Sequence, residues 1–333
     1  MILVVVEHEG GTLDRLSLEA LAMGRRLADA TGSPLQAVAW GDGAAAAAGP
    51  LAGAGVAVLH VIEDPRISDY APEAIGKALA QLIEREQPLA VIGGGGERAA
   101  ELLAHVAART GAPLAANSTD VRPGEPWQVT RQRWGGSLLE EARLDGPIRL
   151  LTVAAHAVAP AAVTAAGAAG PVTVQPFAPE LTERDLRVRI TSRVPAEAGK
   201  ISLADARVVV GGGRGVGSAE GFAELDELAA LLGGAVGVSR VVTSAGWRPH
   251  AQQVGQTGTR IAPDLYIACG ISGAIQHMVG ARSAKAILAI NTDRDAPMVT
   301  RATYAVIGDL HTVLPAIISA VRAAQEGGRP GRP

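Results

Sequence analysis

Between Gln253 and Asn291 the chain reads QVGQTGTRIAPDLYIACGISGAIQHMVGARSAKAILAIN. This stretch places glycines, small hydroxyl side chains, glutamine amides and one histidine around a single apolar run, residues 265–269. Glycine lets a ligand approach the backbone closely, and hydroxyl and amide groups hydrogen-bond a polar molecule. We therefore interpret the stretch as one strand of an α/β sheet that carries a site for a charged, planar ligand.

Four further short apolar runs in the second half of the chain end in the same way. The five runs are residues 208–211, 236–238, 265–269, 287–290 and 305–307. The polar or glycine-rich groups that follow them are residues 212–215, Ser239 with Arg240, residues 270–273, Asn291, and Gly308 with Asp309. Ligands of open parallel sheets bind in the crevice at the carboxyl ends of the strands, so five such ends predict a binding site there.

Composition and charge set the limits on fold and partners. The chain has 333 residues, of which 48% are hydrophobic and only 3% aromatic, and it contains 41 glycines. Such a chain is long enough for two domains, with cores of small aliphatic side chains that let helices lie close on a sheet. The net charge of -3 provides no electrostatic footprint for nucleic acid.

The first half of the chain alternates strand and helix patterns. Apolar runs at residues 2–6, 35–40, 56–61 and 89–93 are interspersed with helical patterns at 16–30 and 72–86, and polar short strands follow at 117–151. A charged segment at 181–200 predicts a solvated connector with a boundary near Pro195. We expect two α/β domains, 1–195 and 196–333, each a mostly parallel sheet flanked by helices, the second doubly wound.

Glycines 93–96 follow a strand and precede a helix. A phosphate cradle is conceivable there, but no Lys-Ser or Lys-Thr follows, which favours a close-packed turn and predicts no nucleotide in the first domain.

Neither export nor membrane insertion is expected. The first apolar run is only five residues long and lacks a basic leader, and the Ala-rich stretch 150–170 contains His156 and Pro160, which favours a strand followed by a connector. The single cysteine, Cys269, lies in an apolar run, where a small buried side chain is the simplest interpretation. A cytoplasmic protein that is not integral to a membrane is predicted.

Two features favour a ligand with phosphates. Ser272 and Gly273 follow a strand and open an expected helix, where free N–H groups bind anions, and Arg214 offers a planar fork to a phosphate. An ordinary N-cap serine and a solvated loop arginine are the alternatives. The chain lacks G-x-G-x-x-G and Walker A motifs, and Arg240 stands where a nicotinamide site usually has an acid, which argues against NAD.

Residues 205–320 resemble the flavin-binding domain of the alpha subunit of electron-transfer flavoprotein. The motifs that carry the resemblance are GGRG at 212–215, VGVSR at 236–240, AGW at 245–247, QVGQTG at 253–258, APDLYIACGISGAIQH at 262–277, AIN at 289–291, APM at 296–298 and GDL at 308–310. The first domain resembles the family more weakly, through its opening strand, the helix after Gly96, RQRWGGSLLEE and the apolar strand near Val153.

The resemblance implies an electron carrier rather than a stand-alone enzyme. It implies one FAD in the C-terminal domain and a heterodimer with a beta subunit, which covers the site and itself holds AMP or a second FAD. Donors would be acyl-CoA dehydrogenases of fatty acid beta-oxidation or other dehydrogenases, and the acceptor a quinone oxidoreductase.

By matched position, the resemblance places a continuous set of residues along FAD, and no catalytic residue or metal ligand. The set is Arg214, Ser239, Arg240, Val254, Gly255, Gln256, Thr257, Gly270, Ser272, Gly273, Ala274, Ile275, Gln276, His277, Asn291, Asp309 and Leu310.

Three of these residues are expected to tune the flavin potential. The resemblance places Thr257 by flavin N5, Arg240 over the ring and His277 near the N1–C2 carbonyl edge. Positive charge and fixed donors in a site of low dielectric stabilise added negative charge, which raises the potential. Gly211 departs from the family, which usually has serine there.

Two alternatives from other classes remain at this point. Residues 270–274 come close to a G-x-S-x-G elbow, with Asp293, Asp295 or Asp309 and then His311 in the chain order of a serine hydrolase whose nucleophile is Ser272. The other is a non-redox nucleotide-binding module that keeps the fold.

Overall fold

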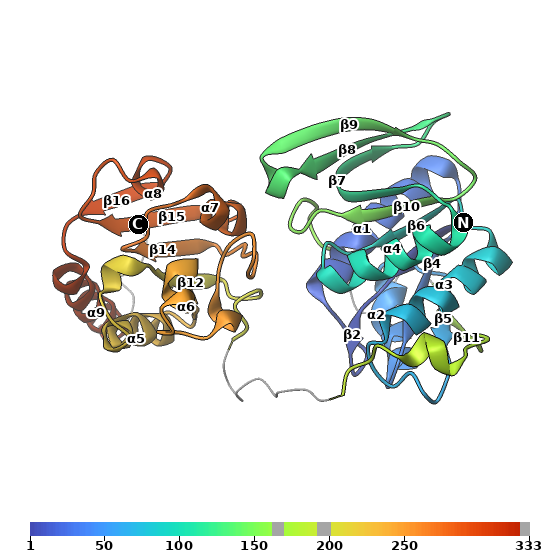
Figure 1. Cartoon of the computed structure of the whole chain (residues 1–333), viewed down its shortest axis with the longest axis horizontal. Helices are drawn as coiled ribbons and strands as arrows, with labels where there is room; N and C mark the ends of the chain where they lie inside the picture. The colour runs from blue at the N-terminus through green and yellow to red at the C-terminus, as the bar shows by residue number, and fades with distance from the viewer. Residues whose placement is uncertain (162–169, 192–200, 327–333) are drawn as a thin grey trace. The chain divides into compact units, whose positions relative to one another are not determined.

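The structure, a computed structural model, describes residues 1–161, 170–191 and 201–326. The chain divides into two compact units, Met1–Val194 and Pro195–Pro333. The predicted boundary near Pro195 lies within residues 192–200 and so outside the described residues. Each unit is an α/β body with its own sheet (Figure 1).

The N-terminal unit contains a sheet of nine strands within the described residues. Their bounds are β1 Ile2–Val5, β4 Leu35–Trp40, β5 Val58–Ile62, β6 Ala90–Gly93, β7 Leu114–Arg122, β8 Trp127–Arg133, β9 Leu138–Leu144, β10 Arg149–Val153 and β11 Thr173–Phe177. The order across the sheet is β11-β5-β4-β1-β6-β10-β7-β8-β9. All neighbours are parallel except β7 with β8 and β8 with β9, which are antiparallel.

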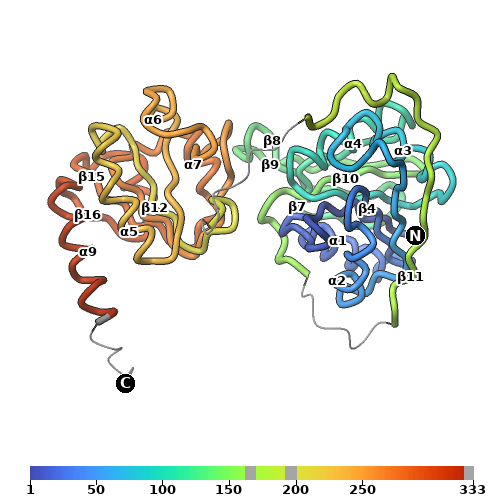
Figure 2. The backbone as a smooth tube through the Cα atoms, turned by 90° about the horizontal axis from the view of Figure 1, so that it is seen from below, coloured from blue at the N-terminus to red at the C-terminus, as the bar shows by residue number. Residues whose placement is uncertain are grey.

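Helices cover both faces of this sheet, as Figure 2 shows. Helices α1 (Arg15–Thr31) and α2 (Ala48–Gly53) lie on one face, and α3 (Pro72–Glu86) and α4 (Glu97–Thr110) lie on the other. Strand β1 supplies both cores, because Ile2 and Val4 pack in the first cluster and Leu3 and Val5 in the second. The prediction of a mostly parallel sheet flanked by helices is confirmed.

The remaining elements of this unit are short. They are strands β2 (His8–Glu9) and β3 (Thr12–Leu13), which pair as a small hairpin, and the 3-10 turns η1 (Ala44–Ala47), η2 (Trp134–Gly136) and η3 (Glu183–Leu186).

The glycine turn after β6 is packed against backbone. A Cβ at Gly94 would lie 2.9 Å from the carbonyl oxygen of Leu16, and one at Gly95 would collide with the backbone of Val153 and Ala155. Only glycine fits such contacts, so the interpretation as a close-packed turn is confirmed.

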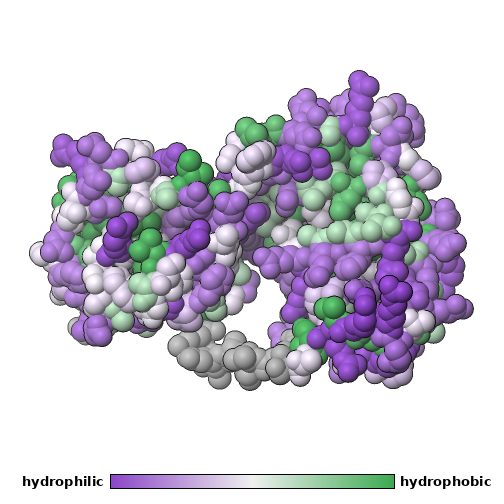
Figure 3. Space-filling view, in the orientation of Figure 1, coloured by the Kyte–Doolittle hydropathy of each residue, from purple (hydrophilic) through white to green (hydrophobic). Residues whose placement is uncertain are grey.

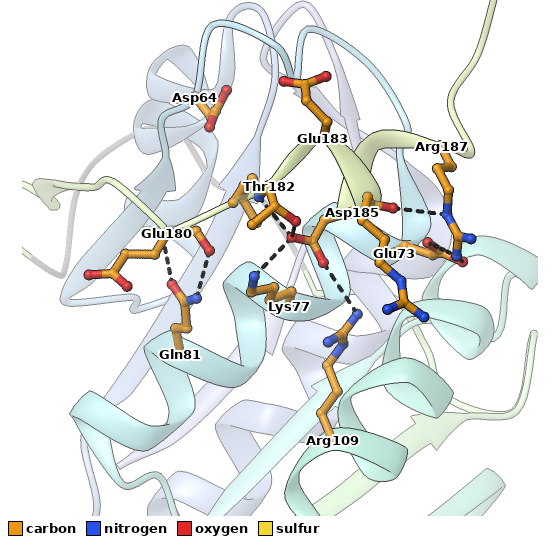
Figure 4. A network of polar contacts seen from close by, with 12 residues as sticks. Asp64, Glu73, Lys77, Gln81, Arg109, Glu180, Thr182, Glu183, Asp185 and Arg187 are labelled. Atoms are coloured by element: carbon orange, nitrogen blue, oxygen red, sulfur yellow. Dashed lines mark hydrogen bonds and ion pairs between the residues drawn. The ribbon is translucent and has the colours of Figure 1, made fainter.

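Polar contacts tie the segment after β11 to α3 (Figure 4). The Lys77 ammonium lies 2.8 Å from Oδ2 of Asp185, which also accepts hydrogen bonds from the backbone and hydroxyl of Thr182. Burial alone would raise the pKa of Asp185, but the hydrogen bonds from Lys77 and Thr182 outweigh it and hold that pKa well below its usual range. The charged segment predicted to be a solvated connector is therefore anchored where it is described.

The C-terminal unit contains a parallel sheet of five strands within its described residues. The strands are β12 Val208–Gly212, β13 Ala235–Val238, β14 Leu265–Cys269, β15 Ala286–Asn291 and β16 Tyr304–Ile307. Their order is β13-β12-β14-β15-β16. Strand β13 lies on one side of β12, and the later strands are added on the other side, so the strand order reverses between β12 and β14. In doubly wound folds of this order, ligands bind at that reversal point.

Helices again cover both faces of the sheet. Helices α5 (Ala223–Leu231) and α9 (Leu310–Glu326) pack on the face that includes Val210 and Ile267. Helices α7 (Ile275–Ala281) and α8 (Pro297–Thr300) pack on the face that includes Val209 and Ala268. The doubly wound prediction is confirmed. The other elements are α6 (Arg240–Ser244) and the turns η4 (Arg214–Val216), η5 (Glu220–Phe222) and η6 (His250–Gln252).

Among the described residues, no helix has both the length and the apolar content needed to cross a membrane. Figure 3 shows hydrophilic residues over most of the face that each unit turns to the viewer.

Candidate functional site

A cavity of about 710 Å³ lies at the carboxyl ends of the C-terminal strands. This volume falls within the range of about 300–1,000 Å³ that is usual for sites of small ligands and cofactors. Residues that follow all five strands line it, as the parallel order predicts.

The cavity brings together all the predicted FAD-lining residues except Gly273 and Ile275. A Cβ at Gly273 would collide with the backbone of Met298, so this glycine packs on α8. Ile275 begins α7 and is 62% exposed. Further lining residues fall outside the set that the resemblance places along FAD, and each lies within a few positions of a member of that set: Gly215, Val241, Ser244, Gln253, Ile271, Thr292, Asp293, Ala296 and Gly308.

Two strand-end loops meet backbone to backbone at the reversal point. The Gly213 N–H donates to the carbonyl of Cys269 at 2.9 Å, and the Gly215 N–H donates to the carbonyl of Gly270 at 3.1 Å. A side chain at Gly213 would collide with the backbone of Gly270, which itself has a positive φ of 61°. Glycine is needed here to bring the loops together beside the cavity.

The helix after β14 begins later than the sequence pattern suggested. Helix α7 starts at Ile275 with Ala274 as its N-cap, because Gly273 has φ of 79°, which is not helical. Ser272 is therefore not the N-cap, and its exposed side chain lies on the cavity wall instead.

The QVGQTG loop is braced by its own hydrogen bonds. The Thr259 N–H donates to the carbonyl of Gln253 at 2.7 Å, and the Gln256 N–H donates to the carbonyl of Gln276 at 2.8 Å. A Cβ at Gly258 would collide with the backbone of Gln253, and one at Gly255 would lie 2.9 Å from the Gln276 carbonyl oxygen. The two glycines allow this tight loop, which backbone hydrogen bonds hold in place.

Two arginines place positive charge at the cavity. Arg214 and Arg240 are exposed and line the wall, and neither forms an ion pair with a described residue. The carboxylates of Asp293 and Asp309 also line the wall, and each accepts a hydrogen bond from a nearby backbone N–H. The guanidinium groups remain available to an anionic ligand.

His277 is buried on the cavity wall. It is only 6% exposed, and its Nε2 lies 2.7 Å from the hydroxyl oxygen of Tyr266. Its Nδ1 is buried and lacks a hydrogen-bond partner of ordinary geometry within the described residues. Burial lowers the pKa of His277 to about 4, against a smaller opposing effect of the Val254 backbone. The imidazole is therefore neutral at pH 7.

Nothing in the residue pattern distinguishes Tyr266 from the other members of its apolar run. This tyrosine is fully buried on β14, and burial holds its pKa well above the usual value, so the hydroxyl stays protonated. A Cβ at Gly211 would collide with the Tyr266 hydroxyl. The glycine that departs from the family pattern thus makes room for the phenol.

Cys269, which ends the same strand, matches its prediction as a small buried side chain. It is fully buried, and burial raises the pKa of its thiol to about 12.

The geometry gives no support to a serine hydrolase. The His311 ring lies 3.4 Å from a carboxylate oxygen of Glu224, and Asp309 accepts from the backbone N–H of His311 rather than from its ring. Across the described part of the chain, no hydrogen bond joins His311 to Ser272. The same residues contain no group of three or more side chains able to hold a metal ion.

Together, a doubly wound sheet, a strand-end cavity, glycine loops and two arginines with no carboxylate partner in the described part of the chain define a domain that binds an anionic nucleotide cofactor. Residues 202–282 match the model of the electron transfer flavoprotein FAD-binding domain. Residues 2–179, more than half of the chain, match the model of the electron transfer flavoprotein domain. The chain belongs to the electron transfer flavoprotein alpha-subunit family.

Similar proteins span nearly the whole chain. The electron transfer flavoprotein subunit alpha of Mycobacterium tuberculosis H37Rv is 40% identical over 324 residues, which is 97% of this chain and 98% of that protein. The subunit alpha of Thermoanaerobacterium thermosaccharolyticum is 33% identical over 323 residues, or 96% and 97% of the two chains. Protein FixB of Bradyrhizobium diazoefficiens is 37% identical over 327 residues, or 96% and 88%.

Proposed function

We propose that this chain binds one FAD in the C-terminal cavity and relays electrons as a heterodimer with a beta subunit. The observation that carries the proposal is the cavity at the point where the strand order of the C-terminal sheet reverses. Residues 202–282, which contribute much of its wall, match an FAD-binding domain. Electron relay is the general role of the family, and the chain's own residues suit the cofactor in three ways.

The first is charge. Arg214 and Arg240 come from the ends of β12 and β13 and lack carboxylate partners within the described residues. We assign Arg214 to the pyrophosphate and Arg240 to the ring. Charge-assisted hydrogen bonds from arginine to phosphate are roughly twice as strong as neutral ones.

The second is donor placement. We assign the Thr257 hydroxyl to flavin N5 and the His277 imidazole to the N1–C2 carbonyl edge. The hydroxyl of Tyr266 has Nε2 of His277 as its hydrogen-bond partner, and this contact fixes the orientation of the imidazole ring. A neutral donor in a site of low dielectric stabilises negative charge that develops opposite it.

The third is loop shape. The QVGQTG loop and the 270–273 loop are held by glycine contacts and backbone hydrogen bonds, which give the cavity wall a defined shape. FAD, when bound, supplies the redox chemistry by accepting and releasing electrons. The chain's residues bind it, orient it and set the electrostatic field around its ring.

The partner assignments follow the family. We propose that the beta subunit covers the cavity and holds AMP or a second FAD, that acyl-CoA or other dehydrogenases are donors, and that a quinone oxidoreductase is the acceptor. A role in fatty acid beta-oxidation and a cytoplasmic location stay predictions.

Co-expression with a beta subunit tests the proposal. The purified complex is expected to be yellow, to be reduced and reoxidised reversibly, and to release FAD on denaturation, identified by mass. A colourless nucleotide without a reducible chromophore supports the binding-module alternative. Labelling of Ser272 by a fluorophosphonate in a colourless protein supports the hydrolase.

A further inference from the structure

We propose that Gln253 is a positioning residue that fixes the direction of the Thr257 hydroxyl, so that its proton points away from Gln253 and is available to the cavity. This inference rests on the proposed function, because it concerns the residue assigned to flavin N5. Sequence comparison with the family placed Thr257 on the cofactor but gave Gln253 no role.

Gln253 sits in a closed polar environment beside the cavity. Gln253 is only 2% exposed. Its side-chain amide nitrogen lies 2.9 Å from the hydroxyl oxygen of Thr257 and 3.2 Å from the carbonyl oxygen of Thr257. Its amide oxygen lies 2.6 Å from the hydroxyl of Thr243. The amide therefore bridges α6 and the far side of the QVGQTG loop.

The carbonyl of Thr257 decides which way the amide faces. A carbonyl oxygen only accepts hydrogen bonds, so the amide group turned towards it must be the NH₂. The same NH₂ then donates to the hydroxyl oxygen of Thr257. On the other side, the amide oxygen lies 2.6 Å from the Thr243 hydroxyl, whose one proton is shared between this oxygen and the carbonyl oxygen of Arg240 at 2.9 Å. Exchanging the amide oxygen and nitrogen would set two oxygen acceptors against each other.

This direction leaves the proton of Thr257 unused. A hydroxyl has one proton, and its oxygen already accepts from Gln253. Across the described residues, the Thr257 hydroxyl donates to no acceptor, and Thr257 lines the cavity. The β-branched side chain and the braced loop limit its other orientations. Gln253 thus makes Thr257 a fixed donor rather than a hydroxyl that donates or accepts equally.

A fixed donor discriminates between states of the ligand. It suits a ring nitrogen that carries a lone pair, and it is mismatched to one that carries a proton. With flavin in the cavity, Gln253 favours the states in which N5 is unprotonated. Loss of the amide frees the hydroxyl to accept, which favours protonation of N5 and lowers the fraction of one-electron-reduced protein at half reduction.

The test is a double-mutant cycle in the FAD-loaded complex with the beta subunit. Gln253→Leu removes the amide, Thr257→Val removes the hydroxyl at nearly constant shape, and the fraction of one-electron-reduced protein is measured by electron paramagnetic resonance. We expect Gln253→Leu to lower the equilibrium constant for forming the one-electron-reduced state, calculated from that fraction, about threefold to tenfold, the worth of one ordinary hydrogen bond. In the Thr257→Val background, the same change is expected to have less than a twofold effect.

A second variant covers the case in which Gln253→Leu fails to fold. Gln253→Glu keeps the shape but presents oxygen to Thr257, so the hydroxyl donates to it and turns its lone pair to the cavity. Gln253→Glu is expected to lower the one-electron-reduced fraction more than Gln253→Leu does. Part of this loss is expected to disappear when Thr257 is also replaced by valine. A simple effect of the added charge would persist in the Thr257→Val background, which separates the two causes. Gln252→Leu, in the adjacent glutamine off the cavity wall, controls for loss of a glutamine side chain.

The outcomes separate the two proposals. An equal effect of the Gln253 variants with and without the Thr257 hydroxyl, or no effect at all in a flavin-loaded complex, overturns the positioning role and leaves the proposed function standing. Absence of flavin from the wild-type complex overturns both.

Discussion

The two units build the same kind of strand edge and use it differently. In the N-terminal unit, the glycine turn after β6 is filled by the backbone of Leu16, Val153 and Ala155. In the C-terminal unit, glycines bring two loops into contact beside a cavity of about 710 Å³. A glycine-rich strand end is therefore no indication of a ligand by itself. The atoms that face each glycine decide whether it closes a turn or shapes a site.

Charge separates the two edges as well. The pocket beside the ends of β1 and β4 measures about 240 Å³ and is lined by Glu7, Asp42 and Asp69 along with Arg98. Burial, helped by the charge of Asp14, raises the pKa of Glu7 to about 7. Such a pocket is small and rich in carboxylates, and an anionic cofactor is disfavoured there. The C-terminal cavity instead has two arginines, Arg214 and Arg240, that form no ion pair with any residue the structure describes.

The largest expected effect comes from exchanging glycine for valine at both edges. Gly213→Val forces its side chain into the backbone of Gly270, and Gly95→Val does the same at Ala155. Each is expected to destabilise its own unit by about 1–3 kcal/mol or more. Only Gly213→Val is expected to abolish flavin retention. Thermal unfolding measures the loss of stability, and the flavin absorbance per complex measures flavin retention. If Gly95→Val lost its flavin and Gly213→Val kept it, the claim that only the C-terminal glycines shape the flavin site would be wrong.

Charge removal at the cavity is the next largest change. Arg240→Ala is expected to weaken FAD binding about twofold to thirtyfold, the worth of a cation–π contact over the ring, and to lower the flavin potential. Arg207→Ala, whose guanidinium pairs with Asp264 off the cavity wall, is the matched control. Fluorescence titration and redox titration provide the readouts. An unchanged potential in Arg240→Ala would remove its tuning role.

The polar anchor of the N-terminal unit is expected to affect stability alone. Asp185→Asn is expected to lower the free energy of unfolding by about 1–3 kcal/mol without changing flavin binding. The folded pKa of Asp185 is depressed, so its contribution is present above the unfolded pKa of about 3.9 and is lost as pH falls below it. Urea titrations at pH 7 and pH 3 check this, and equal losses at both pH values would exclude the ionic contribution.

The smallest expected effect is the loss of stability of the C-terminal unit as the pH falls. The folded pKa of His277 is about 4, below the unfolded value of about 6.5, so stability is lost as pH falls from about 6.5 towards 4. His277→Gln is expected to reduce that loss by about 1–2 kcal/mol in urea titrations of the flavin-free chain. A wild-type chain equally stable at pH 7 and pH 4.5 in this unit would contradict the neutral, buried imidazole.

Sequence reasoning reached the architecture and much of the cavity wall because both depend on local patterns. Apolar runs ended by polar residues predicted the strands and the shared edge, and the order of motifs predicted which loops line it. The Tyr266 contact with His277 depends on which face of β14 meets α7, which the apolar run does not encode. The contact of Gln253 with Thr257 is not predictable from the sequence, because nothing local shows that the Gln253 amide turns towards Thr257.

The features that could not be predicted from the sequence depend on contacts between residues far apart in the chain. Lys77 and Asp185 lie 108 residues apart, and composition alone made the segment around Asp185 resemble a solvated connector. A charged segment anchored by ion pairs and one surrounded by water have the same composition. Only the tertiary position of α3 distinguishes them.

Photolabelling with an azido derivative of FAD tests the central claim most directly, because it reports which unit of the chain holds the cofactor. The complex with the beta subunit is loaded with the probe, irradiated and digested, and labelled peptides are identified by mass spectrometry. Our account predicts label on peptides between residues 212 and 310, with competition by unmodified FAD. Competed label confined to residues 1–194 of this chain, or to the beta subunit, would contradict it.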